Sequence, residues 1–460
     1  MYYCLSRDIG LRSWWRVPYA YYKKYERNAI SLMKEEYEML CLCDGKHDLE
    51  ESEMIEHLLK RGLIFPIEKD SGKLDEWQQQ KHYENRYVPC MNWMITGKCN
   101  YNCLHCFNAS DNAPLQSTFS MEEAEKLMDE AKNCGIHAFT ITGGEPMAHP
   151  HFLEIVQGIY QRGMYIFELN TNGSFIHQRI LNEMKKCHCN PLIKISFDGL
   201  GYHDWMRNQK GAEEEALKAI RLCIENGFQV MVQTNINRKN KDAILETLCL
   251  LNEMGVVETR IICTTEAPRW QKNAAGASFT ITEYFNECLQ IAQKYIEKPK
   301  RMIVDFWQFL YLDPNTKRYQ MSAYKDAHIA YRETLPLCRG NRGMIGVAAN
   351  GEVTPCLQMS GWLNQHHVTF GNVKKQSLQS LLQDSKYLNE VCATMKDLKE
   401  ENPKCAGCMH FKDCRGGCRA LGLLLSGGNF RGSDESKCIF FQQGYEEKVK
   451  KTLQNYKNNQ

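Results

Sequence analysis

The chain has 460 residues, a formal net charge of +2 and 22 cysteines. The balanced charge and the lack of a basic block argue against nucleic acid as the main partner, and no apolar run reaches the roughly 18 residues that span a membrane. The N-terminal stretch lacks the apolar segment of a secretory signal, so we expect a cytoplasmic protein. In a reducing compartment, many cysteines indicate metal ligands more than disulfides. Cys134, Cys223 and Cys249 lie on apolar helical faces and are expected to be ordinary buried thiols.

Residues 1–84 are predicted to form a first unit. The stretch 32–65 reads as a helix, a turn at Asp44 and Gly45, a second helix that stops at Gly62, and a short strand. This order is typical of a small winged-helix module. Residues 68–86 are polar and are predicted to be a linker.

Residues 85–305 alternate between strand-like and helix-like segments. Ser120 and Glu123 form a predicted capping box at the start of the first helix. Six strand–helix starts follow one another at the spacing of parallel β/α units. The predicted strands cover residues 88–96, 136–142, 164–170, 191–197, 228–235 and 256–263. Eight units would close a TIM barrel, so six predict a partial barrel that is open on one side.

Polar and glycine-rich residues follow each predicted strand. Three cysteines, Cys99, Cys103 and Cys106, come after the first strand in a C-x3-C-x2-C arrangement, and "GGEP" comes after the second. Because the carboxyl ends of parallel strands meet on one face, these loops are predicted to surround one pocket. A structural zinc site uses four protein ligands, whereas three thiolates on a cubane iron–sulfur cluster leave one iron open to another ligand.

The remainder, residues 306–460, is less regular and contains seven further spaced cysteines. Cys338 and Cys356 belong to a C-x12-G-x4-C pattern, and a C-x2-C-x5-C-x3-C pattern follows, with one more cysteine beyond it. These later cysteines are Cys405, Cys408, Cys414, Cys418 and Cys438. A zinc ribbon is the competing interpretation, but tetrahedral sites need four or eight ligands and this set has seven.

Together these motifs resemble the radical S-adenosylmethionine (SAM) superfamily, in its SPASM-domain branch, and are most similar to maturases of ribosomally made peptides. The resemblance rests on "CNYNCLHC", on "GGEP" and on the seven C-terminal cysteines. It implies a partial (β/α)6 TIM-type barrel with an N-terminal winged-helix-like module and a C-terminal SPASM domain. SAM would chelate the open iron, and an electron from the reduced cluster would yield a 5′-deoxyadenosyl radical.

The resemblance also implies roles for individual residues. Cys99, Cys103 and Cys106 would hold the SAM-binding cluster, with His105 at a position that is usually aromatic. Gly143 and Gly144 would let the backbone approach the ligand, and Glu145 would offer a carboxylate to the SAM ammonium. Ser196 would contact the ribose or carboxylate region and Arg207 the carboxylate. The remaining expected SAM-site residues are Pro146, Asn172 and Asp198; Asn-Gly at 172–173 is also a turn signal. No catalytic acid or base is identified.

Two auxiliary [4Fe–4S] clusters are implied as well, which makes three clusters in all. One would be held by Cys405, Cys408, Cys414 and Cys438. The other would be held by Cys338, Cys356 and Cys418, whose fourth ligand is missing; Cys392 or a more distant thiol would fill the gap, or the iron stays open for substrate.

The implied substrate is a precursor peptide whose leader binds the N-terminal module at a strand edge, with flavodoxin or ferredoxin as reductant. The competing interpretation of residues 1–84 is that they only cover the barrel. Glu266 and Arg269 after the sixth strand are candidates to contact the peptide core, and the equal alternative is a structural role at the start of a helix. Sulfatase-maturing enzymes resemble the chain but carry an Asp after the cysteine of G-x4-C, where this sequence has Leu357. Two further hypotheses are a radical enzyme that acts on a small molecule and a non-enzymatic iron–sulfur carrier.

Overall fold

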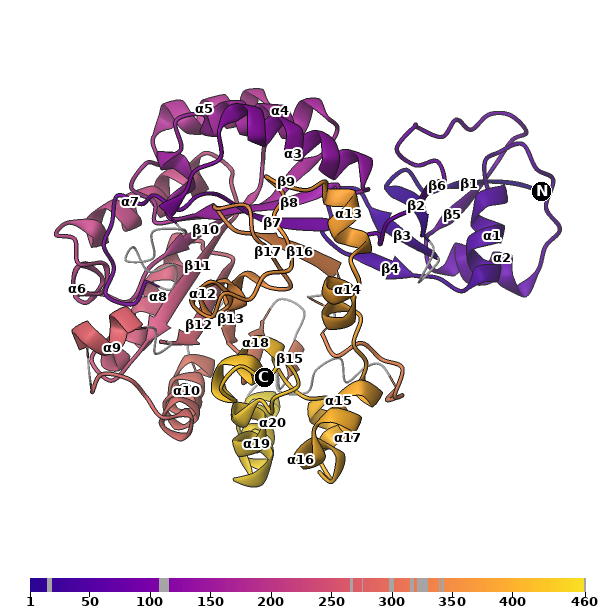
Figure 1. Cartoon of the computed structure of the whole chain (residues 1–460). Coiled ribbons are helices and arrows are strands. Elements are labelled where there is room, and N and C mark those ends of the chain that lie inside the picture. Colours follow the sequence, from indigo (N-terminus) through magenta and orange to yellow (C-terminus); the bar gives the residue numbers. More distant parts are fainter. Residues whose placement is uncertain are drawn as a thin grey trace.

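The computed structural model of the chain describes residues 1–14, 19–106, 116–264, 268–274, 276–297, 302–314, 318–320, 330–338, 340 and 343–458. These residues form a large curved sheet with helices on its outer side, an N-terminal part that projects from one end, and a helical C-terminal part (Figure 1). The α/β fold class with a parallel, TIM-type sheet is therefore confirmed. No helix among the described residues is both long and apolar enough to cross a membrane.

The central sheet has 11 strands in the order β15-β14-β13-β12-β11-β10-β9-β8-β7-β16-β17. Strands β7 to β13 are parallel neighbours in chain order, and β16 pairs in parallel with the free side of β7. Their bounds are β7 (Cys90–Thr96), β8 (Ala138–Gly143), β9 (Tyr165–Thr171), β10 (Leu192–Ser196), β11 (Val230–Ile236), β12 (Glu258–Cys263), β13 (Ile303–Phe306), β14 (Leu310–Asp313), β15 (Arg318–Gln320), β16 (Met344–Val347) and β17 (Val353–Thr354). The six predicted strands are β7 to β12. Strands β13 and β16, which lengthen the sheet at both ends, were not predicted from the sequence.

Amphipathic helices cover the outer face of this sheet. They are α3 (Met121–Asn133), α4 (Phe152–Gln161), α5 (Gln178–Lys186), α7 (Ala212–Glu225), α8 (Ile244–Met254) and α10 (Ile281–Ile296). The predicted capping box is present, because the Glu123 N–H donates to Ser120 Oγ at 3.1 Å and the Ser120 N–H donates to the Glu123 carboxylate at 2.9 Å. Cys134 and Cys223 are buried in the main core as predicted, and Cys249 is half-buried.

The N-terminal part contains two small sheets and two helices. Its elements are β1 (Tyr2–Leu5), β2 (Ile9–Trp14), β3 (Tyr19–Lys23), β4 (Ala29–Ser31), α1 (Lys34–Leu42), α2 (Glu53–Lys60), β5 (Ile64–Ile67) and β6 (Lys81–Tyr83). The predicted helix–turn–helix–strand order corresponds to α1, α2 and β5. The linker prediction is wrong, because β6 pairs in parallel with β2 and the side chains of Gln78 and Arg86 are buried.

The N-terminal part packs against the amino ends of β8 and β9. The Glu26 carbonyl accepts hydrogen bonds from the Tyr165 hydroxyl and, at 3.1 Å, from His137 Nε2. Tyr22 stacks on the His137 ring with centroids 3.9 Å apart. This face of the barrel lies opposite the carboxyl ends of the strands, where the predicted site lies.

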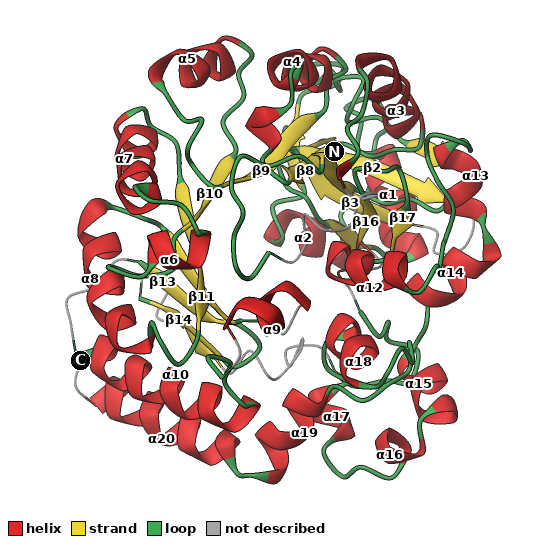
Figure 2. Cartoon of the chain, turned by 60° about the vertical axis from the view of Figure 1, so that its left-hand side comes forward, coloured by secondary structure: helices red, strands yellow, loops and turns green. Residues whose placement is uncertain are grey.

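The C-terminal part is a series of short helices. They are α12 (Ser360–Gln365), α13 (Leu378–Gln383), α14 (Ser385–Val391), α15 (Met395–Glu401), α16 (Pro403–Ala406), α17 (Phe411–Cys414), α18 (Arg419–Leu425), α19 (Glu435–Gln442) and α20 (Tyr445–Asn458). In Figure 2 they form an arc from α20, beside α10, round to α13, beside α3. The arc joins the two ends of the curved sheet.

Candidate functional site

The loop that carries the first three cysteines follows β7 at the carboxyl end of the sheet. Two short helices after later strands hold it, α6 (His203–Arg207) and α9 (Pro268–Ala274). The Leu104 N–H donates to the Met206 carbonyl at 3.0 Å, and Arg269 donates to the Asn102 carbonyl at 3.3 Å. Arg269 therefore supports the cysteine loop, while Glu266 lies outside the described residues.

The three thiols of this loop lie near one another. Although the residue is exposed at the surface, desolvation of its sulfur, followed by the charges of Cys103, Glu145 and Cys106, raises the pKa of Cys99 to about 12, and the Tyr101 N–H, which donates to the sulfur at 3.4 Å, opposes this. Mutual repulsion of this kind is relieved when the thiolates bind a cation or a cluster. Within the described ranges, no three His, Cys, Asp or Glu side chains converge closely enough to hold a single metal ion. The larger [4Fe–4S] cube, with one thiolate per iron, suits three such thiols.

The GGEP segment packs directly on the start of the cysteine loop. The Gly144 N–H donates to the Thr96 carbonyl at 2.8 Å, and the Glu145 N–H donates to the Lys98 carbonyl at 2.9 Å. A Cβ on Gly143 would lie 2.3 Å from the Thr96 oxygen, and one on Gly144 would lie 2.3 Å from the Lys98 oxygen. The neighbouring backbone therefore requires both glycines, whereas the sequence motif suggested only that a ligand requires them.

Glu145 links the GGEP segment to the end of β9. Its carboxylate, which is fully buried, accepts hydrogen bonds from the Thr171 hydroxyl at 2.9 Å, the Asn172 N–H at 2.8 Å and the Met147 N–H at 3.1 Å. Burial raises its pKa to about 7. Pro146 begins the short 3-10 helix η2 (Pro146–Ala148) directly after it. The contact of Glu145 with the SAM ammonium stays a prediction, beside this observed structural role.

Asn172 lies beside the cysteine loop as predicted for a pocket residue. Its Nδ2 donates to Asn100 Oδ1 at 2.9 Å and to the sulfur of Cys99 at 3.9 Å. Its Oδ1 accepts from the backbone and hydroxyl of Ser174, so the Asn-Gly turn is also real. Ser196 ends β10 and is partly exposed, and its contact with SAM stays a prediction.

Asp198 and Arg207 form a buried ion pair at 2.8 Å. Burial alone would raise the pKa of Asp198, but Arg207, His105 and His203 together lower it well below its ordinary value. The sequence placed both residues near SAM but did not indicate that they pair. It also left out His203, whose Nδ1 accepts from the Asp198 N–H at 3.0 Å; the i, i+4 spacing of His203 and Arg207 was the available signal.

His105 lies within the cysteine loop, is half-buried, and is edge-on to Trp270 with ring centroids 6.4 Å apart. Burial lowers its pKa to about 4, so the ring is neutral at pH 7. Its Nδ1 and the Nε of Arg207 have no hydrogen-bond partner among the described residues. Unpaired buried polar atoms of this kind are rare and indicate a missing partner, which the polar groups of a bound amino acid such as the methionine part of SAM would provide.

Four C-terminal cysteines form one group. Burial, then the charges of Cys405, Cys408 and Cys438, raises the pKa of Cys414 to about 12. Burial raises the pKa of Cys438 to about 11, with Cys405 again among its charged neighbours. These are the four thiols that the resemblance assigns to one auxiliary cluster.

The remaining three form a second group. Burial, then the charges of Cys418 and Cys338, raises the pKa of Cys356 to about 12. Cys392 lies near the Cys338 segment along the backbone, since the Leu337 N–H donates to the Ala393 carbonyl at 2.8 Å. The Cys392 side chain packs against the main core, which contains Tyr387, and the two side chains interact electrostatically. Its role as fourth ligand therefore stays a prediction.

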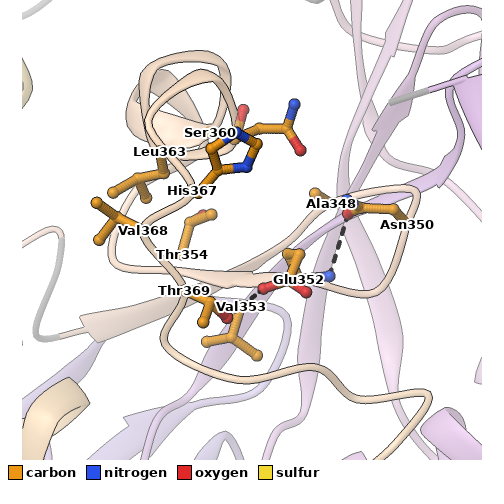
Figure 3. Close-up of a pocket in the computed structure, with 11 residues that line it drawn as sticks. Ala348, Asn350, Glu352, Val353, Thr354, Ser360, Leu363, His367, Val368 and Thr369 are labelled. Carbon is orange, nitrogen blue, oxygen red and sulfur yellow. Dashed lines mark hydrogen bonds between the residues drawn. The ribbon is translucent and has the colours of Figure 1, made fainter. Parts of the chain in front are cut away.

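A pocket of about 230 Å³ lies between the β16–β17 hairpin and α12. Figure 3 shows Glu352 and Thr369 at its edge, joined by a hydrogen bond, with His367 on the opposite wall. None of the predicted site residues lines it.

Two family descriptions match the chain. Residues 93–251 match the Radical SAM superfamily, and residues 338–409 match SPASM, an iron–sulfur cluster-binding domain. The first region contains the cysteine loop, GGEP and the Asp198–Arg207 pair, and the second contains Cys338, Cys356, Cys405 and Cys408.

Relatives and solved structures agree with this assignment. The AdoMet-dependent heme synthase of Methanosarcina barkeri is 26% identical over 353 residues, which cover 76% of this chain and 95% of the relative. PqqA peptide cyclase of Granulibacter bethesdensis is 23% identical, over 72% of this chain and 83% of its own. Streptococcus suis SuiB bound to precursor peptide SuiA is 14% identical, covers 95% of this chain and 99% of its own, and superimposes with a TM-score of 0.65.

The cofactors of the superfamily are SAM and a [4Fe–4S] cluster, and the first three thiols and the unpaired atoms beside them fit that set. The chain belongs to the radical SAM superfamily, in the branch that carries a SPASM domain, and it is an enzyme.

Proposed function

We propose that the chain is a peptide maturase that removes hydrogen from a ribosomally made precursor and installs a thioether or carbon–carbon crosslink. When bound and reduced, the cofactors supply a 5′-deoxyadenosyl radical for this step. We infer three units, residues 1–84, 85–305 and 306–460, with two auxiliary clusters in the last and a flavodoxin or ferredoxin as reductant. The observation that carries the proposal is a strand edge in the first unit.

Strand β5 pairs with β1 on one side only in the described part of the chain. The Leu5 N–H donates to the Cys43 carbonyl, and the Gly45 N–H donates to the Tyr3 carbonyl. The backbone N–H and C=O groups of Tyr3 and Leu5 therefore point away from β5. Because directly opposed residues of an antiparallel pair share one orientation, Ile64, opposite Leu5, points its N–H and C=O outward. Such an edge is the surface to which an extended peptide adds as a strand.

The side chains beside this edge also suit a peptide. Phe65 is 36% exposed on β5, and α2 packs against the same strand. Pro66 has no N–H, which leaves its carbonyl as an outward acceptor and discourages uncontrolled pairing. Main-chain bonds would supply affinity, and the apolar surface would supply specificity for the leader.

The geometry sets a minimum length for the precursor. The N-terminal part contacts the amino ends of β8 and β9, whereas the cysteine loop follows the carboxyl end of β7. β7 and β9 each have seven residues, so the two faces are separated by about 23 Å at about 3.3 Å per residue. A spacer of at least about seven extended residues must connect the leader to the modified core.

The likeness to SuiB extends over 95% of the chain, which includes the N-terminal part, and that structure holds a precursor peptide. The heme synthase relative matches 76% of the chain, so a small-molecule substrate of the tetrapyrrole class is the second candidate. Formylglycine formation is disfavoured, because Leu357 stands where the expected Asp base would follow Cys356.

The test uses the purified holoenzyme and a labelled synthetic leader of each short peptide encoded nearby. Deleting residues 1–84 would uncover His137 and Tyr165, so point variants are sharper. Ile64→Pro removes the outward N–H, and Ile64→Ala is the matched control, because it loses comparable buried apolar surface and keeps the N–H. We expect the affinity for the leader to fall about fivefold more in Ile64→Pro than in Ile64→Ala, which corresponds to about 1 kcal/mol for one hydrogen bond. Equal binding by the two variants, or no leader bound by the unaltered enzyme, would count against the strand edge.

A further inference from the structure

A buried guanidinium lies against one of the three thiols that would hold the SAM-binding cluster. Arg207 donates from NH1 to the sulfur of Cys103 at 3.8 Å and is 7% exposed. Its NH2 lies 2.8 Å from the carboxylate of Asp198. We propose that Asp198 holds Arg207 against Cys103 so that its charge stabilises the reduced cluster and raises the reduction potential, a role that goes beyond the proposed function and does not depend on the substrate.

Asp198 is fixed from several sides, which suits a positioning residue. It is fully buried, and its Oδ1 accepts from the Asn235 N–H at 2.9 Å. Its carbonyl accepts from Asn240 Nδ2 at 2.7 Å, and its own N–H donates to His203 Nδ1 at 3.0 Å. The Asp198 backbone and its Oδ1 are therefore held in place, and Oδ2 is the atom that lies against the guanidinium.

Arg207 contacts the sulfur of Cys103 directly, and among its guanidinium nitrogens only Nε has no partner in the described part of the chain. Two of its three nitrogens are engaged, one by Cys103 and one by Asp198. Hydrogen bonds and positive charge at a ligand sulfur stabilise the added electron and so raise the potential of an iron–sulfur cluster. Asp198 opposes this charge, since it lies on the far side of the guanidinium, but it also keeps the guanidinium in place.

The experiment measures the midpoint potential of the SAM-binding cluster and SAM affinity in the same samples. The cluster takes up one electron from a low-potential chemical reductant and is followed by electron paramagnetic resonance, in enzyme that retains the iron content of the unaltered chain. Arg207→Gln should make the midpoint potential more negative by at least about 59 mV, which is a tenfold change in the equilibrium constant for a one-electron reduction. In Arg207→Lys the negative shift of the potential should be less than half as large, because lysine keeps the positive charge. Arg238→Gln is the matched control, since Arg238 pairs with Glu283 at 2.7 Å on the surface.

Asp198→Asn gives an opposite prediction. It removes the opposing charge and keeps a hydrogen-bond acceptor, so the potential should become less negative. If Arg207→Gln cannot hold the cluster, Arg207→Lys and Asp198→Asn decide the question by these shifts. A lowered potential in Arg207→Gln supports the proposal whether or not SAM affinity also falls. An unchanged potential with weakened SAM binding would overturn it and assign the guanidinium to the SAM carboxylate, and an equal shift in Arg238→Gln would overturn it as well.

Discussion

Replacement of Gly144 by alanine tests how the GGEP segment positions the cysteine loop. The added Cβ would lie 2.3 Å from the Lys98 oxygen, 2.5 Å from the Lys98 carbonyl carbon and 2.6 Å from the Gly97 oxygen. All three atoms are backbone, so no side chain can turn aside and the loop itself must move. Overpacking of this kind costs about 1–3 kcal/mol. The hydrogen bonds at the same contact, from the N–H groups of Gly144 and Glu145, are stretched by the same movement.

The expected result is a loss of the first cluster with modest loss of stability. For a unit of this size, about 1–3 kcal/mol corresponds to a fall of about 2–12 °C in Tm. Iron content should fall by about four atoms from about 12, since a cubane holds four irons, and reductive SAM cleavage should stop. Gly343→Ala is the control, because a Cβ there has no neighbour within 4 Å. Full iron content, unchanged Tm and normal SAM cleavage in Gly144→Ala would refute this role of the glycine.

The pH dependence of stability, the auxiliary thiols and the leader–core spacer can each be tested as well. Because burial raises the pKa of Glu145 to about 7, the stability that its protonated form provides is present below pH 4.5 and is lost as pH rises through 7. Across that range the free energy of unfolding of the unaltered enzyme, measured without oxygen, should fall by up to about 3 kcal/mol relative to that of Glu145→Gln. Parallel pH profiles of stability for the two proteins would contradict this. Cys405→Ala or Cys408→Ala should leave SAM cleavage intact yet block formation of the peptide product, which is followed by chromatography. A normal yield of product would mean that the group of Cys405, Cys408, Cys414 and Cys438 is structural only. Precursors with leader–core spacers cut below about seven residues should bind but not be modified, and efficient modification of a shorter spacer would exclude binding at the β5 edge.

The location of the site was predictable because it follows from chain periodicity. The alternation of strands and helices predicts a parallel sheet, and the carboxyl ends of such strands meet on one face. The loops that contain Cys99, Gly144, Asn172 and Asp198 meet there in the structure, through contacts such as that between Asn172 and Cys99. The grouping of the seven C-terminal thiols came from the family resemblance and not from the spacing, which alone would place Cys418 with Cys405, Cys408 and Cys414; it stays a prediction.

The partners of the charged side chains were not predictable. Nothing in the spacing of Asp198 and Arg207 shows that a short helix turns the guanidinium back onto the carboxylate and onto Cys103. Glu145 was expected to contact the SAM ammonium because it stands in the GGEP motif, yet in the structure three donors enclose its carboxylate.

The N-terminal part illustrates a different difficulty. Residues 68–86 are polar, which is typical of a linker, but β6 gains its stability from pairing with β2, far away in the sequence. Strands β1 to β4 lie in a stretch rich in Tyr and Arg, where alternation of apolar and polar residues is weak. Such long-range pairing leaves little local signal.

Whether the chain is a radical SAM peptide maturase is tested most directly by the mass of its product. Each short peptide encoded nearby is co-expressed without oxygen with the unaltered enzyme and with the Cys99→Ala, Cys103→Ala, Cys106→Ala triple variant, and the purified peptides are compared by mass spectrometry. We predict that one peptide loses two hydrogen atoms per crosslink with the unaltered enzyme and is unchanged with the triple variant. If every peptide keeps its mass while the purified enzyme cleaves SAM reductively, a peptide substrate is contradicted and a small-molecule substrate takes its place.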